Sequence, residues 1–545
     1  MSELESKDYS ADGLTLLLSV SSKSPNIIIS SKCETIFGSD QNNYAFRIAK
    51  DIVETFAFQN NPNLRYINNY AFHSCTKLRS VDLSMCTKLE KLGSFSFSKC
   101  LSVTTFILPE GLKVIGYCAI SELSITTINI PSSVTYISDF GVSNMRSLKN
   151  VTFSKGSRLT ILMFNTFITT GLTTFTIPEK ISSLNGLTFS DCASMETIYL
   201  DPLNNNFYCD RNIAIYSSDK TKIIYCCANC SESYTVLSST ITITSGAFTK
   251  SSLKNIYLPD GITSIQNYAF TDSALTRITL PKKLVNISKN TFQRSGLTSI
   301  IIPDSVELID DNAFDGCRKL KTIVLPSSLK SIGGGALPNY NDVNITFANN
   351  TNLFLDKQYI LYSDKNTTIS QFLGSLSELT IPNIVTIIKT GSFKWNTYIS
   401  SISFSGESNL QYIEYDAFKG CTNLRKFDFG SKIVEIQYNA FENTILDSEI
   451  SFPDTLKLIG DSAFKNCKFI PSIIFESLSS FYNKQSYELY KQLYSNYPLT
   501  IRNDAFSSCS SICEIVIYRE TSISLGQNTF IGLISLTRFT FCDIL

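Results

Sequence analysis

The chain has 545 residues, with 47 basic and 47 acidic side chains and 43% hydrophobic residues. This length exceeds what one globular core can fill, so several domains or a repeat array are expected. The balanced charge gives no basic footprint for nucleic acid or anionic lipid, and no apolar run approaches the roughly 20 residues of a membrane span.

Residues 1–50 precede the regular part of the chain. Their opening, MSELESKDYSADG, is acidic where a secretory leader would be basic, so no conventional signal peptide is predicted. The runs LTLLLSV and NIIIS could pair as strands. Because an open end of a repeat stack would expose core and strand edges, we expect residues 1–50 to form a cap.

From about residue 51 onward one unit recurs, LxxIxLPxxLxxIxxxAFxxC. Alignment on the Phe of AF gives 17 anchor positions, of which 14 are Phe; most lie 22 to 25 residues apart, and Ile or Leu lies five residues before each. This period is in the range of leucine-rich repeats. The anchors are Phe72, Phe97, Ile120, Val142, Phe167, Phe189, Phe248, Phe270, Phe292, Phe314, Leu337, Phe393, Phe418, Phe441, Phe464, Phe506 and Phe530.

Each unit predicts one coil of a solenoid. In LxxIxL alternate residues point inward, which predicts a short parallel strand, and Pro follows that strand in nine coils, where it ends the ladder. The second half, LxxIxxxAF, returns apolar side chains beneath the sheet. We therefore expect an α/β-type repeat solenoid, a leucine-rich repeat rod of about 17 coils of 22–25 residues. A continuous parallel β-sheet would form one face, and mostly irregular or short-strand structure the other.

Three gaps between anchors are too long for one coil. The first two contain related segments, FYCDRNIAIYSSDKTKIIY and LFLDKQYILYSDKNTTIS, which predict β-hairpins that are either family decoration or contact surfaces. The third contains Tyr487, Tyr490 and Tyr494, whose spacing predicts an amphipathic helix that either packs on the rod or offers a partner site. The predicted segments are a cap (1–50), repeats (51–200), a hairpin insert (201–231), repeats (232–347), a hairpin insert (348–375), repeats (376–475), a Tyr-rich helical insert (476–498) and C-terminal repeats (499–545).

Residues for catalysis are scarce. The only histidine, His73, cannot form a triad or a histidine-based metal site alone, and it is expected in a loop. No phosphate-binding glycine motif is present, and Gly333–Gly335 fall on a turn. We expect no enzyme activity and no cofactor or metal.

Seven of the 16 cysteines, Cys75, Cys100, Cys192, Cys317, Cys421, Cys467 and Cys509, lie three residues after an anchor. Other coils have Ser in this slot, so a small side chain that makes a weak hydrogen bond explains it without oxidation. Cys226, Cys227 and Cys230 form a local cluster that is either a disulfide or free thiols. Unpaired thiols favour a reducing compartment.

The motif LPxxLxxIxxxAFxxC, over about residues 50 to 542, resembles the BspA-like leucine-rich repeat family. The resemblance implies a leucine-rich repeat fold and a surface antigen or adhesin, of the type known from bacteria and parasitic protists, that binds host proteins or other cells. It implies no catalytic residues.

Outward strand positions carry hydroxyl ladders with a few large side chains, and Thr there is also simply a good strand residue. The candidate protein-binding residues are Tyr199, Tyr257, Arg277, Tyr487, Tyr490 and Tyr494. Two functions stay open: a surface adhesin for host or cell proteins, and an intracellular structural scaffold in a cytoskeletal or other large assembly. The first implies the cell surface; the missing leader and membrane segment favour the cytoplasm. Both need protein partners, with neither nucleic acid nor a membrane span.

Overall fold

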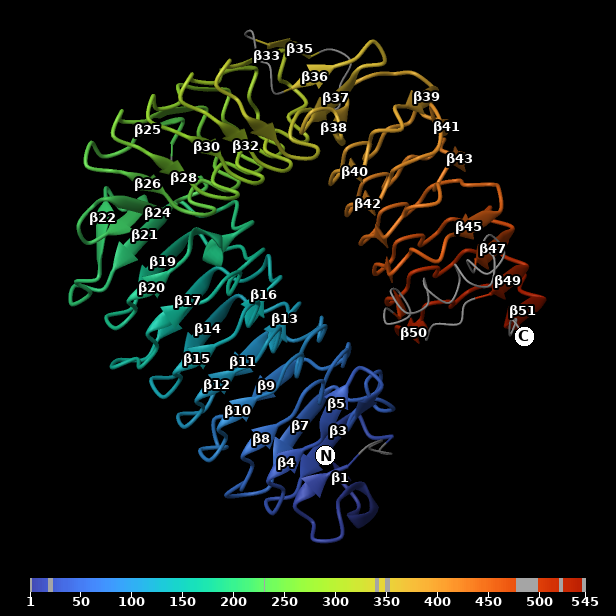
Figure 1. The fold of residues 1–545 in the computed structure, drawn as a ribbon. Coiled ribbons are helices and arrows are strands. Elements are labelled where there is room, and N and C mark those ends of the chain that lie inside the picture. Colours follow the sequence, from blue (N-terminus) through green and yellow to red (C-terminus); the bar gives the residue numbers. More distant parts are fainter. Residues whose placement is uncertain are drawn as a thin grey trace. The chain divides into compact units, whose positions relative to one another are not determined.

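The structure is a computed structural model that describes residues 2–17, 23–229, 231–338, 343–347, 353–476, 498–518 and 523–541. The chain divides into two compact units, each a stack of coils (Figure 1). Unit 1 comprises Met1–Lys283 and Ser295–Leu297, and unit 2 comprises Leu284–Arg294 and Thr298–Leu545.

A typical coil contains two short strands. In one such coil β14 (Thr127–Ile130) comes from LxxIxL, and β15 (Tyr136–Ile137) comes from the LxxI that precedes the anchor. β14 pairs in parallel with β17 (Asn150–Phe153), and β15 pairs in parallel with β12 (Val114–Ile115) of the neighbouring coil. Ile128 and Ile130 are buried while Thr127 and Asn129 are exposed, which is the alternation that the motif predicts.

Strands therefore form on two faces, and neither ladder is continuous. The first-strand ladder is split into sheets of two to four strands, as in β45-β47-β49-β51. The expectation of one unbroken sheet was wrong: the ladder breaks at the hairpin inserts and also between consecutive coils, as between β11 (Thr105–Ile107) and β14. The longest ladders are built mainly of second strands, and in unit 2 the strands β36 and β37 of the hairpin insert extend one of them. They are β2 (Thr15–Leu16), β4 (Thr35–Ile36), β8 (Tyr66–Ile67), β10 (Lys91–Leu92), β12 and β15 in unit 1, and β36 (Phe354–Leu355), β37 (Ile360–Ser363), β38 (Thr368–Phe372), β40 (Ile387–Ile388), β42 (Tyr412–Ile413), β44 (Glu435–Ile436), β46 (Leu458–Ile459), β48 (Leu499–Ile501) and β50 (Ile523–Leu525) in unit 2.

The α/β label was also wrong. Within the described ranges the only helices are two short 3-10 turns, η1 (Ser6–Asp8) and η2 (Gly186–Phe189), so the chain is a β-solenoid. It has about 22 turns rather than 17. The predicted helix of residues 476–498 lies outside the described residues but for its first and last positions.

The additional turns come from segments without the regular spacing. Phe46 stacks on the first anchor, Phe72, with ring centroids 4.3 Å apart, although Ile36 lies ten residues before it instead of five. The hairpin of β5 (Gly38–Asp40) and β6 (Asn43–Tyr44) occupies the extra length. Within the inserts, Tyr225 lies 5.1 Å from Phe189 and Phe372 lies 5.5 Å from Phe393. Each insert therefore contributes a ring to the anchor stack.

The anchors form the centre of the core. Phe441 stacks on Phe418 at 5.0 Å and on Phe464 at 5.2 Å, and all three rings are fully buried. The cysteine slot is tied to these anchors, because six of its seven thiols donate a hydrogen bond to the carbonyl oxygen of the anchor one coil earlier. Cys421 Sγ lies 3.0 Å from Phe393 O, and Cys467 Sγ lies 3.0 Å from Phe441 O. Burial with a backbone acceptor explains this slot without oxidation.

The Asp and Tyr that the two hairpin inserts have in common are hydrogen-bonded in both, directly in the second insert and through Tyr234 of β25 (Ser233–Thr235) in the first. β22 (Phe207–Asp210), β23 (Ala214–Ser217) and β24 (Lys222–Cys226) are antiparallel, as are β36, β37 and β38. In the first insert the buried Asp210 carboxylate accepts a 2.9 Å bond from Tyr234, whose hydroxyl lies 2.8 Å from that of Tyr216. In the second insert Asp356 accepts a 3.2 Å bond from Tyr362. The acidic and Tyr residues common to both inserts thus stabilise the hairpins.

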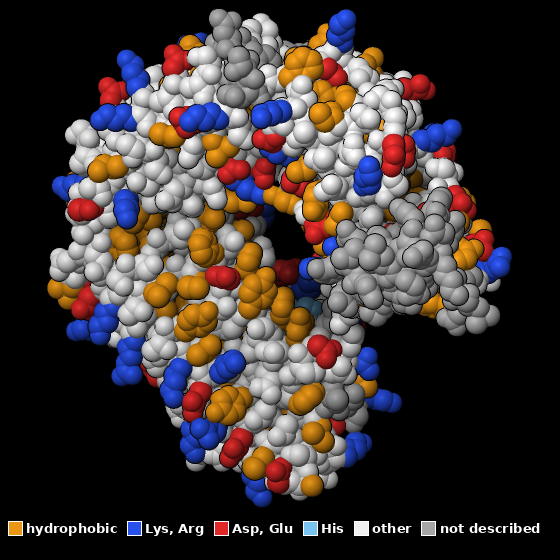
Figure 2. Space-filling view, viewed as in Figure 1, with side chains coloured by type: hydrophobic (Ala, Val, Ile, Leu, Met, Phe, Trp, Pro, Cys, Tyr) orange, Lys and Arg blue, Asp and Glu red, His pale blue; other side chains and the backbone are white. Residues whose placement is uncertain are grey.

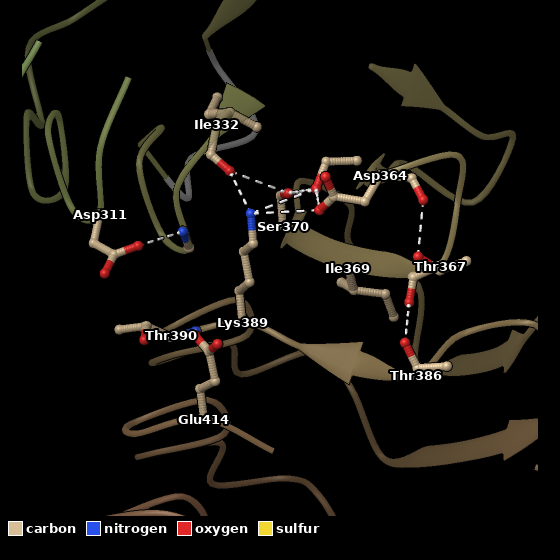
Figure 3. A network of polar contacts seen from close by, with 12 residues as sticks. Asp311, Ile332, Asp364, Thr367, Ile369, Ser370, Thr386, Lys389, Thr390 and Glu414 are labelled. Atoms are coloured by element: carbon tan, nitrogen blue, oxygen red, sulfur yellow. Dashed lines mark hydrogen bonds and ion pairs between the residues drawn. The ribbon is translucent and has the colours of Figure 1, made fainter. Parts of the chain in front are cut away.

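Lys389 joins the second insert to the coils on either side (Figure 3). The ladder of second strands stops at β34 (Ser331–Ile332) and resumes at β38. Across this break the Lys389 ammonium donates to Ile332 O at 3.1 Å and to Ser363 Oγ at 3.5 Å. Its side chain is only 18% exposed, so a mostly buried lysine, together with Ser370 and Gln371, supplies hydrogen bonds across the break in the ladder.

Candidate interaction surface

Two residues before almost every anchor the backbone adopts a left-handed conformation. Most coils have Asn, Asp or Gly there, which are the residues that tolerate it best. In unit 1 the position is instead aromatic in several coils. The residues are Tyr70 (φ 61°), Phe95 (φ 56°), Phe140 (φ 58°) and Tyr268 (φ 61°). A bulky residue in this region is strained, and such strain concentrates at functional positions.

Three of these side chains belong to one contiguous row. Tyr70 stacks on Phe95 at 4.8 Å, Phe95 contacts Tyr117 at 5.3 Å, and Tyr117 contacts Phe140 at 5.4 Å. Tyr117 lies three residues before its anchor, beside the left-handed Cys118. Phe164 holds the same place in a later coil and is 48% exposed. We call Tyr70, Phe95, Tyr117, Phe140 and Phe164 the aromatic row.

Hydrophobic side chains gather on this part of unit 1. Figure 2 shows them over the coils of β13 (Ile120–Ser121) and β16 (Val142–Ser143), which follow Tyr117 and Phe140 directly in the chain. Exposed aromatic groups are rigid and cost little side-chain entropy on binding, which is why they dominate interface hot spots. The row therefore offers a binding surface of unusual composition.

His73 lies at one end of the aromatic row, in a turn as expected. Its ring meets that of Tyr70 edge-on at 5.3 Å and that of Tyr44 at 6.2 Å. Burial lowers the pKa of His73 to about 4, and the charges of Lys99 and Lys50 act in the same direction. The imidazole is therefore neutral at physiological pH and extends the apolar surface.

The corresponding turns of unit 2 are charged. Lys394 and Asp416 form a 2.7 Å ion pair, as do Lys419 and Glu442, with all four side chains less than a quarter exposed. Of these four residues, Asp416 holds the place of Tyr70 and Phe95, whereas the other three directly follow an anchor, as His73 does. The place of Tyr117 is also aromatic in unit 2, at Tyr415 and Tyr438, so what distinguishes unit 1 is the aromatic residues at the left-handed position.

The glycine cluster of unit 2 serves packing. A Cβ on Gly334 would lie 2.1 Å from Thr390 O, and one on Gly333 would lie 2.3 Å from Asp311 N. Only glycine allows these turns to approach so closely. Tyr415 donates to the Asp311 carboxylate at 3.2 Å, from a coil 104 residues further along the chain.

The candidate protein-binding residues predicted from the sequence lie in separate places in the structure. Tyr257, in β27 (Asn255–Tyr257), and Arg277, in β29 (Arg277–Ile278), lie in one sheet and are exposed. Tyr199 is exposed in β21 (Thr197–Leu200), which belongs to another sheet. Tyr487, Tyr490 and Tyr494 lie outside the described residues. Sequence reasoning missed the aromatic row, although Tyr70, Phe95 and Phe140 replace the Asn, Asp or Gly of other coils.

A surface depression of about 470 Å³ in unit 1 is polar. Glu90 at its centre pairs with Arg65 at 3.0 Å and with Lys113 at 3.1 Å, and these bonds lower the pKa of the Glu90 carboxyl. Two of the cations that line the depression are thus already bonded to one carboxylate. In the described part of the chain no group of three His, Cys, Asp or Glu side chains could hold a metal ion. Cys226 and Cys227 are buried, and Cys230 lies outside that part. None of its helices is long and apolar enough to cross a membrane.

Known proteins share this repeat architecture. A leucine rich cell surface protein from Faecalibacterium prausnitzii is 23% identical, with a TM-score of 0.50 over 62% of this chain and 92% of that one. The pneumococcal vaccine antigen PcpA is 20% identical, with a TM-score of 0.39 over 76% and 85%. A leucine-rich repeat protein from Eubacterium ventriosum is 14% identical, with a TM-score of 0.36 over 80% and 89%.

No curated protein matches the chain in sequence. The profile of the BspA type Leucine rich repeat region matches residues 65–196, 241–367, 370–494 and 448–545, which together cover most of the length. Together with the anchors and the paired strands, this match shows that the chain belongs to the BspA-type leucine-rich repeat family.

Proposed function

We propose that the chain is a non-catalytic, protein-binding repeat scaffold that acts as a cell-surface antigen or adhesin and contacts its partner through the aromatic row. The observation that carries this proposal is the row of aromatic side chains on neighbouring turns, in which Tyr70, Phe95 and Phe140 lie at a left-handed position that other coils fill with Asn, Asp or Gly. A solenoid of fixed core and variable surface suits this use, because outward side chains can change without loss of packing.

The contribution of the row can be measured by truncation. Aromatic residues at the centre of an interface cost about 2 kcal/mol or more when replaced by Ala, which is roughly a 30-fold loss of affinity. Tyr117 and Phe164 are the most exposed members of the row. Their replacement should therefore weaken partner binding while leaving the buried anchors intact.

The first test is protease shaving of living source cells, with a cytosolic protein as leakage control. Peptides of this chain that are released before the control place it at the surface; peptides that appear only with the control refute the adhesin role and favour an internal scaffold.

The second test is photo-crosslinking on those cells with benzoylphenylalanine at position 164 or, as matched control, at Tyr438, which is 53% exposed in unit 2. A protein adduct at 164 that the control lacks, and that Tyr117→Ala removes, supports the proposal. Equal labelling at both positions refutes a role for the aromatic row.

A further inference from the structure

The turn that follows each anchor contains a second left-handed position, two residues after the anchor. Where the backbone there is left-handed, the described coils have polar residues or Gly, such as Asn443 (φ 60°) and Asn466 (φ 60°), with one exception. Trp395, the only tryptophan of the chain, occupies this position after Phe393 with φ 59° and is 59% exposed. A bulky residue in this conformation is strained, and such strain concentrates at functional positions.

The indole of Trp395 rests on the neighbouring coil, where Gly420 holds the same position. The Trp395 N–H donates to Lys419 O at 2.8 Å, which keeps the two turns in register. A Cβ on Gly420 would lie 2.1 Å from Cε3 of the indole, so only a residue without a side chain allows the ring to lie there. The six-membered ring thus covers Gly420, while more than half of Trp395 stays open to solvent.

The next two turns continue this surface with side-chain amides. Asn443 and Asn466 follow Gly420 in order, because each turn donates a backbone N–H to a carbonyl of the next one. Asn466 Nδ2 donates to Asn443 Oδ1 at 3.0 Å. Among the described residues nothing bonds Asn443 Nδ2 or Asn466 Oδ1, so one donor and one acceptor are available to a ligand.

A surface depression of about 280 Å³ lies beside these amides. The stretch from Phe441 to Leu446 is one residue shorter than the equivalent stretch from Phe464 to Ile470, which leaves space beside the longer turn. Phe469, which is 54% exposed, forms an apolar wall of the depression. The lining therefore combines polar and apolar groups: Asn443, Thr444, Ile445, Asn466, Lys468 and Phe469.

We infer that Trp395, Gly420, Asn443, Asn466 and Phe469, which we call the Trp395 surface, bind a short oligosaccharide. A sugar ring has apolar C–H groups that pack on aromatic rings, and hydroxyl groups that need both donors and acceptors. The indole and the Phe469 ring provide the aromatic surfaces, and the two amides provide the donor and the acceptor. Three coil spacings of roughly 4.8 Å separate Trp395 from Asn466, so the surface spans roughly 14 Å, the length of a short oligosaccharide.

The arrangement of the side chains favours a sugar over a protein partner. Protein hot spots are clusters of well-packed aromatic and Arg side chains, surrounded by contacts that exclude water. On the Trp395 surface the two aromatic residues belong to coils three spacings apart, and amides and a partly polar depression lie between them. The aromatic row of unit 1 differs in this respect, because its rings contact one another directly.

The single tryptophan makes the Trp395 surface directly measurable. The labelled 545-residue chain is applied to an array of immobilised neutral and acidic oligosaccharides, and those that bind are titrated in solution while Trp395 emission is recorded. We expect a saturable blue shift, because a sugar ring stacked on the indole displaces water. Asn466→Gly, which removes the amide without straining the left-handed backbone, should weaken binding roughly tenfold.

Two further variants complete the test. Trp395→Asn places at this position the residue that later coils have there, and it should weaken binding, measured by calorimetry, by roughly tenfold or more. Tyr438→Ala is the matched control, because Tyr438 is 53% exposed in unit 2 but precedes its anchor and lies outside the Trp395 surface. It should leave oligosaccharide binding unchanged.

Several results would overturn the inference. They are an array on which no oligosaccharide binds the chain, binding that Trp395→Asn leaves unchanged, and binding that does not alter the emission of Trp395. Attachment to cells that Trp395→Asn abolishes but that survives enzymatic removal of their glycans would mean that a protein occupies this surface, which also contradicts the inference. The inference does not rest on the proposed function, and none of these results bears on the aromatic row of unit 1.

Discussion

Replacement of Phe441 by Ala tests whether the anchor stack provides the stability of unit 2. Phe441 is fully buried between Phe418 and Phe464, and its ring also lies 5.1 Å from Phe427 and 5.3 Å from Phe429. Loss of a buried Phe costs about 3–5 kcal/mol, and the cost is highest where the site cannot collapse.

The cavity left by this substitution has rigid walls. Phe441 N donates to Ala463 O at 2.7 Å, and Phe418 N donates to Ala440 O at 2.7 Å, so the ladder fixes the spacing of the coils on both sides. We therefore expect a loss of about 4–5 kcal/mol in the free energy of unfolding of the coils from 418 to 464.

Native-state hydrogen exchange is the suitable assay, because a long repeat array need not unfold in one step and local opening free energies can be read coil by coil. Phe164→Ala is the matched control and should cost less than about 1 kcal/mol at its exposed site. A loss below about 2 kcal/mol at Phe441, or an equal loss at amides of unit 1, would show that the stack is not the main source of local stability.

Three further outcomes are expected. Lys389→Met should lower the stability of residues 332–372 by about 1–3 kcal/mol, because Ile332 O loses a charge-assisted bond. Urea unfolding followed at these amides measures this loss of stability. Lys426→Met, at an exposed site, is the control and should have little effect. By NMR, the single histidine should titrate near pH 4 rather than at 6.5. Because the unfolded chain binds the proton more readily than the folded chain does, the free energy of unfolding should fall as the pH drops from about 6.5 to 4. His73→Phe should flatten that pH dependence. Burial raises the pKa of Cys192 to about 11 and of Cys86 to about 12, so iodoacetamide at pH 8 should label the exposed Cys513 at least roughly 100-fold faster, and comparable rates would contradict their burial.

The repeat register was predictable because the apolar residues of the unit recur at a fixed spacing in the sequence. In most coils the Ile or Leu five residues before the anchor becomes the buried residue of a second strand, as Ile413 and Ile436 do in β42 and β44. The coil at Phe46 was missed because a hairpin doubles that spacing, although Ala45 and Phe46 carry the AF signature. Spacing alone does not distinguish an interrupted coil from a cap.

The aromatic row was not predictable from alternation. Hydrophobic periodicity identifies inward positions, whereas Phe95 and Phe140 lie on turns whose backbone conformation is set by the stack. A comparison of the same slot from coil to coil would have revealed them, since Asn312 and Asn439 occupy it elsewhere. The broken ladders, likewise, follow from contacts of residues far apart in the chain.

The thiol bond to the previous anchor has a consequence for how such genes change. Because Cys467 reaches only one coil back, duplication or deletion of a whole coil would leave every core contact with an equivalent partner. Insertions of other lengths break that equivalence and need a bridge of their own. Both hairpin inserts have one: Lys250 bonds Asp191 at 2.7 Å across 59 residues, and Lys389 bonds Ile332 O across 57 residues. Loss of such a bridging lysine should be tolerated only together with loss of its insert. The lysine and the insert are therefore expected to be inherited together.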